Sequence, residues 1–252
     1  MLSPLRVMIK VGERPMDFNP FLDRFSPAHE PDFPGFPEGL FRFLQELKAH
    51  NDRGWFAEHR AEYERYYRQP AMSFCAAFAS RLRQASIPLV SDPRRSPFRI
   101  YRDVRFSANK DPYKTHLGLY FPVLWEEEVG LYLHLEPGNS FLAAGSWSLD
   151  SEWVRRLRRL LAERYSELEA IVGEVAFKAR FQIRGERLRR PPPEYGSAHP
   201  AREWLLHRQL YAQAAIQERE ACRPEILDRL LEDAQRLWPL LELLAPREGS
   251  VA

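Results

Sequence analysis

Basic residues with few acidic partners gather between Arg94 and His116. This stretch holds seven Lys and Arg residues against two acidic residues. Its loop S-A-N-K-D-P-Y-K-T, at 107–115, adds hydroxyl and ammonium groups that can bind an oxyanion through charge-assisted hydrogen bonds. We therefore expect a site for a phosphate or carboxylate group, with the binding residues Arg99, Arg102, Arg105, Lys110 and Lys114. The alternative is a row of structural ion pairs, which produces similar clusters.

The use of lysine in this loop supports the anion-site interpretation. The chain has 32 Arg but only five Lys, and two of the five, Lys110 and Lys114, lie four residues apart in the loop. A lysine ammonium is a compact, rotatable donor whose pKa changes readily on burial, whereas a guanidinium is a fixed planar fork. Lysine at both positions of an arginine-rich chain indicates that an ammonium group is needed there.

Titratable side chains follow in the segment Y-L-H-L-E-P at 132–137. Side chains alternate between the two faces of a strand, so Tyr132, His134 and Glu136 should share one face. We assign His134 to ligand binding, and Glu136 or Asp103 could act as a general base with His116 as the acid. The candidate catalytic residues are therefore Asp103, His116 and Glu136. The alternative is a hydrogen-bonded His–Glu pair on a sheet face.

A metal site is a further alternative for the same pair. With His116 or His199 as a third ligand, His134 and Glu136 would give two histidines and one carboxylate. Spacing identifies no such third ligand, so we assign no metal ligand and leave the cofactor open. The sequence contains no Walker loop, H-E-x-x-H, G-x-S-x-G or G-x-G-x-x-G motif.

A second basic strip runs from Lys178 to Arg190, with six basic residues and one acid. Its segment G-E-R-L-R-R-P-P, at 185–192, could close over the first strip and complete an anion pocket, or form a solvated hairpin tip. Both strips could instead follow a nucleic-acid backbone, although a net charge of +2 is low for that function. An interaction or scaffold protein with acidic partners is the third hypothesis.

We favour the first of these functions, a sheet-face pocket that binds an anionic small molecule. Acid–base chemistry of the hydrolase or transferase type could accompany binding, and the sequence does not decide whether the chain is an enzyme. Its oligomeric state is open as well.

The elements that position these groups follow from the periodicity of apolar residues. Residues 98–106 alternate apolar and polar side chains and predict a strand. Turn signals at 126–128 and 137–139 indicate an antiparallel meander. Its further strands are expected near 116–124, 129–136 and 140–147, followed by a hairpin over 177–190 that turns at Gly185 and a strand over 209–217.

Helices are predicted before and after this sheet in the sequence. The expected ranges are a helix from Glu38, helices at 55–68 (ending before Pro70), 71–85 and 151–172, a short helix from Ala201, and a helix at 224–244 kinked by Pro239. The fold class is therefore α+β: N-terminal helices, a central mainly antiparallel sheet over about 98–147 with added strands near 177–190, and C-terminal helices.

Composition indicates a globular protein, with 44% hydrophobic and 13% aromatic residues. Two cysteines exclude a disulfide scaffold, and no apolar run approaches the ~20 residues that span a bilayer, so we expect a soluble, cytoplasmic protein without membrane contact. We divide the chain into a proline-rich extended arm at 1–35, one domain at 36–245 and a tail at 246–252. The proline-rich residues 1–37 should pack against the body of the domain through Phe18, Phe21, Phe25, Phe33 and Phe36.

The segment F-R-I-Y-R-D-V-R-F-S-A-N-K-D-P-Y-K-T-H, at 98–116, resembles the signature of an uncharacterised family of bacterial and fungal proteins, domain of unknown function 2461. Other landmarks of that family resemble N-D-R-G-W-F at 51–56, Y-L-H-L-E-P-G at 132–138, G-E-R-L-R-R-P-P at 185–192 and Y-G-S-A-H-P at 195–200. The resemblance covers roughly residues 36–245. It implies family membership and no particular activity.

Overall fold

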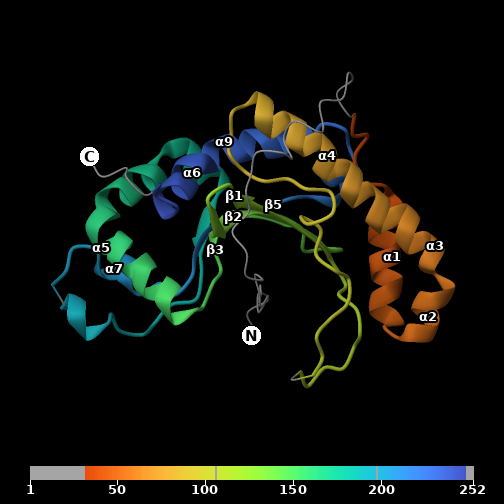
Figure 1. Cartoon of the computed structure of the whole chain (residues 1–252), viewed down its shortest axis with the longest axis horizontal. Coiled ribbons are helices and arrows are strands. Elements are labelled where there is room, and N and C mark those ends of the chain that lie inside the picture. Colours follow the sequence, from red (N-terminus) through yellow and green to blue (C-terminus); the bar gives the residue numbers. More distant parts are fainter. Residues whose placement is uncertain (1–31, 106, 197, 248–252) are drawn as a thin grey trace.

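The computed structural model describes residues 32–247, apart from residues 106 and 197. Within these residues an antiparallel sheet of five strands lies at the centre, in the order β1–β2–β3–β5–β4 (Figure 1). The strands are β1 (Leu117–Val123), β2 (Glu126–Leu135), β3 (Phe141–Ser146), β4 (Gln182–Arg184) and β5 (Leu210–Ala215). Helices precede and follow the sheet, so the predicted α+β class is confirmed.

Alternation along the strands buries one face of the sheet against helices. Leu119 and Phe121 of β1 and Leu133 of β2 belong to the main hydrophobic core. Helices α4 (Gln69–Gln84) and α9 (Ile226–Leu244) lie over this face in Figure 1. The ring centroid of Phe78 on α4 lies 5.1 Å from that of Phe121. Helices α4 and α9, which precede and follow the strands in the sequence, therefore share one core.

The N-terminal helices differ from the prediction near Pro70. Helices α1 (Glu38–Ala49), α2 (Arg53–Glu58) and α3 (Arg60–Glu62) are followed by a π-helical segment, η1 (Tyr63–Arg68), which continues directly into α4. The helix expected to stop before Pro70 therefore runs through it. Pro70 is the second residue of α4 and lies directly after the π-helical segment.

The segment before α1 is held by aromatic packing. The ring centroids of Phe33 and Phe36 lie 5.2 and 5.3 Å from that of Phe74 on α4. Both rings are buried, which confirms the predicted docking of these two residues. The other predicted contacts, from Phe18, Phe21 and Phe25, lie outside the described residues.

The meander is confirmed, but its first predicted strand is wrong. The strands expected near 116–124, 129–136 and 140–147 are β1, β2 and β3, and the strand expected over 209–217 is β5. Residues 97–105 form a loop whose only bridges within the described residues are Pro97–Leu119 and Tyr101–Tyr113. Exposed and less exposed side chains do alternate there, but a strand also needs a neighbouring strand with which it pairs continuously.

The hairpin predicted over 177–190 is wrong as well. Helix α6 (Val175–Arg180) occupies the first part, and Gln182–Arg184 joins the edge of the sheet as β4, paired with β5. The remaining elements are α5 (Ser151–Gly173), a 3-10 turn η2 (Pro193–Tyr195), α7 (Arg202–Leu205) and α8 (Glu218–Ala221). Among the described residues, no helix combines the length and apolar character needed to cross a membrane.

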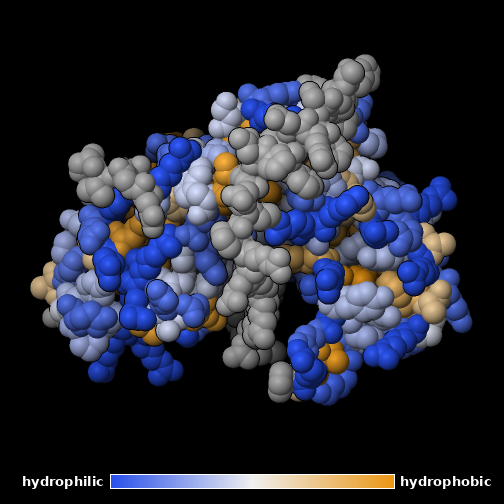
Figure 2. Space-filling model, viewed as in Figure 1, coloured by the Kyte–Doolittle hydropathy of each residue, from blue (hydrophilic) through white to orange (hydrophobic). Residues whose placement is uncertain are grey.

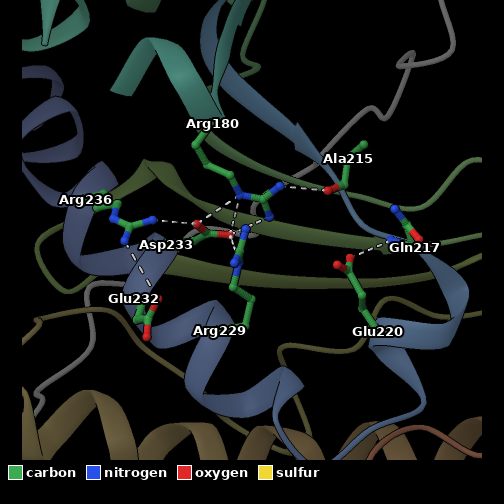
Figure 3. A network of polar contacts seen from close by, with 8 residues as sticks. All are labelled: Arg180, Ala215, Gln217, Glu220, Arg229, Glu232, Asp233 and Arg236. Atoms are coloured by element: carbon green, nitrogen blue, oxygen red, sulfur yellow. Dashed lines mark hydrogen bonds and ion pairs between the residues drawn. The ribbon is translucent and has the colours of Figure 1, made fainter. Parts of the chain in front are cut away.

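A buried carboxylate joins three elements of the C-terminal half (Figure 3). Asp233 of α9 is 0% exposed and accepts hydrogen bonds from the guanidinium of Arg180, with Nη2–Oδ2 at 2.7 Å. Arg180 ends α6 and also donates from Nη1 to the carbonyl of Ala215, at the end of β5. Arg229 and Arg236, on α9 itself, lie 3.7 and 4.0 Å from the same carboxylate. The network therefore ties α6 and the end of β5 to α9.

Candidate functional site

The face of the sheet opposite the main core carries a smaller cluster of rings. Its buried members are Tyr120, Tyr132, Phe141, Ala143, Trp147 and Tyr211, and Phe98 packs against them. These residues alternate along the strands with the core residues, as the pleat requires. His116, His134 and Glu136 lie at one end of this ring-covered face.

Two glycines let the tyrosine rings lie close to the sheet. A Cβ at Gly118 would come within 2.8 Å of the Tyr132 hydroxyl, and a Cβ at Gly130 within 2.8 Å of the Tyr120 ring. A side chain at either position would therefore displace a tyrosine. The Tyr132 hydroxyl is thus directed along β2, where the next polar side chain on the same face is His134.

Tyr132, His134 and Glu136 form a hydrogen-bonded chain along this face. The Tyr132 hydroxyl lies 3.0 Å from His134 Nδ1, and His134 Nε2 lies 3.3 Å from Glu136 Oε2. The bond to His134, helped by the amide of Asn139 at 2.9 Å, lowers the pKa of Glu136 to about 2. An ionised carboxylate can only accept, so Nε2 carries a proton and Nδ1 accepts from Tyr132. Burial raises the pKa of Tyr132, which keeps its hydroxyl a donor.

His116 completes what we call the histidine cluster: Tyr132, His134, Glu136 and His116. The ring centroids of His116 and His134 are 4.3 Å apart. Burial, with the nearby charges of His134 and Lys114, lowers the pKa of His116 to about 3, so its ring is neutral at physiological pH. Its Nε2 is buried and has no hydrogen-bond partner among the described residues. A buried polar atom without a partner is uncommon and marks a position where a ligand atom or water would bind.

Two cations, Lys114 and Arg102, lie close enough to the histidine cluster for their charges to lower the pKa of His116. Lys114 is half-buried, and burial lowers its pKa. Its Nζ lies 5.2 Å from the centroid of the Phe98 ring and has no carboxylate within 4 Å in the described part of the chain. Arg102 donates from Nη1 to the carbonyl of Asp111 at 3.3 Å. Lys114 is therefore a cation available to an anion.

The other predicted site residues lie on the loop that precedes β1. Asp103 pairs with Arg105, with Oδ2–Nη2 at 2.7 Å, and both side chains are exposed. Lys110 donates to the carbonyl of Val104 at 2.9 Å, and Arg99 is exposed. In Figure 2 this loop projects at the lower right as a mainly hydrophilic extension. The ion-pair alternative therefore describes Asp103 with Arg105 and also Arg102 with Asp111, whose Nη1–Oδ2 distance is 3.9 Å. Lys114 and His116 lie at the base of the loop, beside His134 and Glu136.

The histidine cluster does not have the geometry of a metal site. Both ring nitrogens of His134 already have partners, and the planes of the His116 and His134 rings are tilted by 31° to each other. No three His, Cys, Asp or Glu residues in the described ranges are grouped so that they could hold a metal ion. His199, the other possible third ligand, lies before α7, where its Nδ1 accepts from the amide of Ala201.

A hollow of about 310 Å³ adjoins the histidine cluster. Phe141 and Asn139 line it. The Phe141 ring stacks on the His134 ring at 4.6 Å and 11°, and Asn139 holds Glu136. Asn139, Phe141 and Gln213 of this candidate site were not predicted from the sequence. The P-G-N sequence at 137–139 indicates only a turn, and the register that brings β5 to β3 has no local signal.

The second basic strip lies at the opposite edge of the sheet. Arg187 pairs with Glu203 at 2.8 Å, and this segment surrounds a separate hollow of about 430 Å³ with Trp204 and His207. Figure 1 shows α7 and the loop before β1 at opposite sides of the molecule, in agreement with the strand order. The hypothesis that residues 185–192 close over the first strip is therefore wrong.

A family model described as "Conserved hypothetical protein (DUF2461)" matches residues 39–242, which is most of the chain. Neither the curated proteins nor the solved structures gave a match.

Proposed function

The chain belongs to the conserved hypothetical protein family DUF2461, and we propose that it binds a small molecule with a phosphate or carboxylate group at the histidine cluster. One observation carries the proposal: the buried Nε2 of His116 has no partner among the described residues, and it lies beside a lysine without an acidic partner. A neutral hydrogen-bonding nitrogen next to a cation is a suitable environment for an oxyanion.

The charges around the cluster favour an anion on the His116 side. Glu136 is the one acid of the cluster, and its Oε2 already accepts from His134 and Asn139. Lys114 and Arg102 supply positive charge near His116. An anion would accept a charge-assisted hydrogen bond from Lys114 Nζ and a second bond from His116 Nε2 in its protonated tautomer. Arg99, Arg105 and Lys110 would then contribute only to the long-range field that attracts it.

The same cluster supports hydrolase or transferase chemistry. When a water or a substrate hydroxyl replaces Tyr132 at His134 Nδ1, that nitrogen can take its proton, and ionised Glu136 stabilises the imidazolium through Nε2. In this mechanism His134 is the base and Glu136 is a positioning residue. His116 is neutral, so we assign it to binding instead of to proton donation. Asp103 has no role in this mechanism.

Ligand-dependent stability tests the proposal. Inorganic phosphate, an alkyl phosphate and an alkyl carboxylate are added separately, and the melting temperature is measured. At 100 times its Kd, a ligand of the folded state adds about 2.7 kcal/mol to the free energy of unfolding. We expect at least one anion to raise the melting temperature of the wild type. Lys114→Gln should remove the effect, whereas Lys48→Gln, at an exposed position in the last turn of α1, should keep it.

The proposal is wrong if none of the anions stabilises the protein, or if Lys114→Gln responds to them as the wild type does. Binding of duplex DNA with a steep dependence on salt, lost on substitution in both basic strips, would instead favour the nucleic-acid hypothesis.

A further inference from the structure

The hollow beside the histidine cluster has the size of a ligand site. Its volume is about 310 Å³, within the range of roughly 300–1,000 Å³ typical of small-molecule pockets. Its walls come from two segments distant in sequence: the connection from β2 to β3, and the end of β5 with the start of α8. Figure 3 shows Ala215 and Gln217 of the second segment, with Gln217 fixed by Glu220 of α8.

The side chains of the hollow are mainly uncharged hydrogen-bonding groups around an aromatic ring. Asn139 and Gln213 offer amides beside Phe141, whereas the Ser140 hydroxyl already bonds to the backbone of Glu136. The one charged residue among the described lining residues is Glu218, whose Oε1 accepts from the amide of Gly138 at 2.7 Å. A second anionic group would meet a carboxylate here and no cation. Hydroxyl groups, which both donate and accept, fit the amides and the carboxylate.

The hollow and the anion site lie at two ends of one row of rings. His134 of β2 lies opposite Gly118 of β1 and Phe141 of β3 in the sheet register. The rings of His116 and Phe141 flank His134, with centroids 4.3 and 4.6 Å from it. Lys114 and His116 thus lie on the β1 side of His134, and the hollow lies on the β3 side, beyond Phe141.

Gln213 is the wall residue that the sheet register places most firmly. It lies opposite Ala143, and Ala215 lies opposite Phe141. Directly opposed residues share a face, so the Gln213 amide projects on the same face as the Phe141 ring. The Gln213 side-chain amide forms no hydrogen bond with the described part of the chain, so it is available to a ligand.

From these observations we propose that the ligand is a phosphorylated or carboxylated polyol, such as a sugar phosphate. Its anionic group binds at Lys114 and His116, and its hydroxyls enter the hollow. There its hydroxyls bond to Asn139 and Gln213. Because Asn139 also holds Glu136, a hydroxyl in the hollow contacts the group that orients His134. This inference rests on the proposed function.

Matched ligands separate the two proposals. Binding of a hexose phosphate, the same hexose without phosphate, and an alkyl phosphate without hydroxyls is measured by calorimetry on the full chain. We expect the hexose phosphate to bind at least tenfold more tightly than the alkyl phosphate. Gln213→Leu should weaken hexose phosphate binding about tenfold, as for one lost hydrogen bond, and leave alkyl phosphate binding unchanged.

Two controls complete the test. Gln235→Leu makes the same chemical change at an exposed position of α9 and should alter neither affinity. Lys114→Gln should weaken both phosphates. Equal affinities for the two phosphates, or unchanged hexose phosphate binding in Gln213→Leu, would overturn the polyol inference while the anion site stands. If neither phosphate binds the wild type, both proposals fail.

Discussion

At the scale of single residues, His116 makes stability depend on pH. Its pKa is about 3 in the folded protein, because burial disfavours the charged ring, against 6.5 in the unfolded chain. Between these values the unfolded chain binds a proton that the folded chain does not bind. The free energy of unfolding should therefore decrease as the pH falls from 6.5 toward 3, by up to about 1.4 kcal/mol per pH unit.

Urea denaturation at pH 7, 6 and 5 measures this slope. His116→Gln should have a shallower slope than the wild type, and His50→Gln, at an exposed position after α1, should keep it. The comparison uses slopes, so a uniform loss of stability in the variant does not affect it. An identical slope in His116→Gln would show that its ring does not carry the pH dependence.

Glu136 changes stability in the same direction, in a more acidic range. Its folded pKa is about 2, held down first by the bond to His134, against 4.5 when unfolded. The stabilisation from its ionised form is complete above pH 4.5 and is lost as the pH falls through the folded pKa. It therefore contributes much less than His116 to the slope measured between pH 7 and 5.

That neighbouring residues on one strand lie together could be predicted from the sequence, but the proximity of residues from different strands could not. Alternation alone placed His134 and Glu136 on one face, and the structure agrees. Lys114 and His116 followed from residue type within one short loop. Gln213 lies more than 70 positions from His134 and joins the site only through the register of β5 with β3. No local pattern contains that register.

At the scale of elements, the Asp233 network predicts a large stability effect. Asp233→Asn removes the buried negative charge and leaves Arg180 without its carboxylate. Removing one partner of a buried ion pair costs about 3–5 kcal/mol, because the remaining charge stays desolvated. Urea denaturation should show a loss of this size. Glu232→Gln, next to it and exposed, breaks only a 3.8 Å surface pair and should cost less than about 1 kcal/mol. Equal effects of the two substitutions would contradict the structural role of the network.

Strands were predicted well where the segment pairs with neighbouring strands and poorly where it does not. Leu131, Leu133 and Leu135 alternate along β2, which has neighbours on both sides, and the strand forms as predicted. The predicted strand at 98–106 alternates equally well, but its described residues 98–105 lie at the edge beyond β1, where the structure describes only isolated bridges. Periodicity reports which side chains could share a face. Strand pairing depends on the rest of the chain.

At the scale of the whole molecule, the helices that precede the sheet in the sequence and the helix that follows it depend on each other. One hydrophobic core contains residues from Phe33 to Ala245, and both α4 and α9 lie on the same face of the sheet. The chain segment between α4 and α9 contains all five strands of the described sheet. Loss of either helix exposes the sheet face that the other also covers. We therefore predict that residues 36–245 unfold as one cooperative unit.

Hydrogen exchange of Phe36→Ala tests this prediction, because the substitution lies at one end of the core and its effect can be read at the other. Truncating a buried phenylalanine costs about 3–5 kcal/mol, and Phe36 is 1% exposed. If unfolding is cooperative, the most protected amides of α1 and of α9 should lose the same free energy of opening, although α9 begins 190 positions after Phe36. Asp233→Asn, on α9, should lower protection in α1 in the same way. If each substitution lowers protection only in its own half, the helices from the two ends would be separate units, and the single 36–245 domain would be wrong.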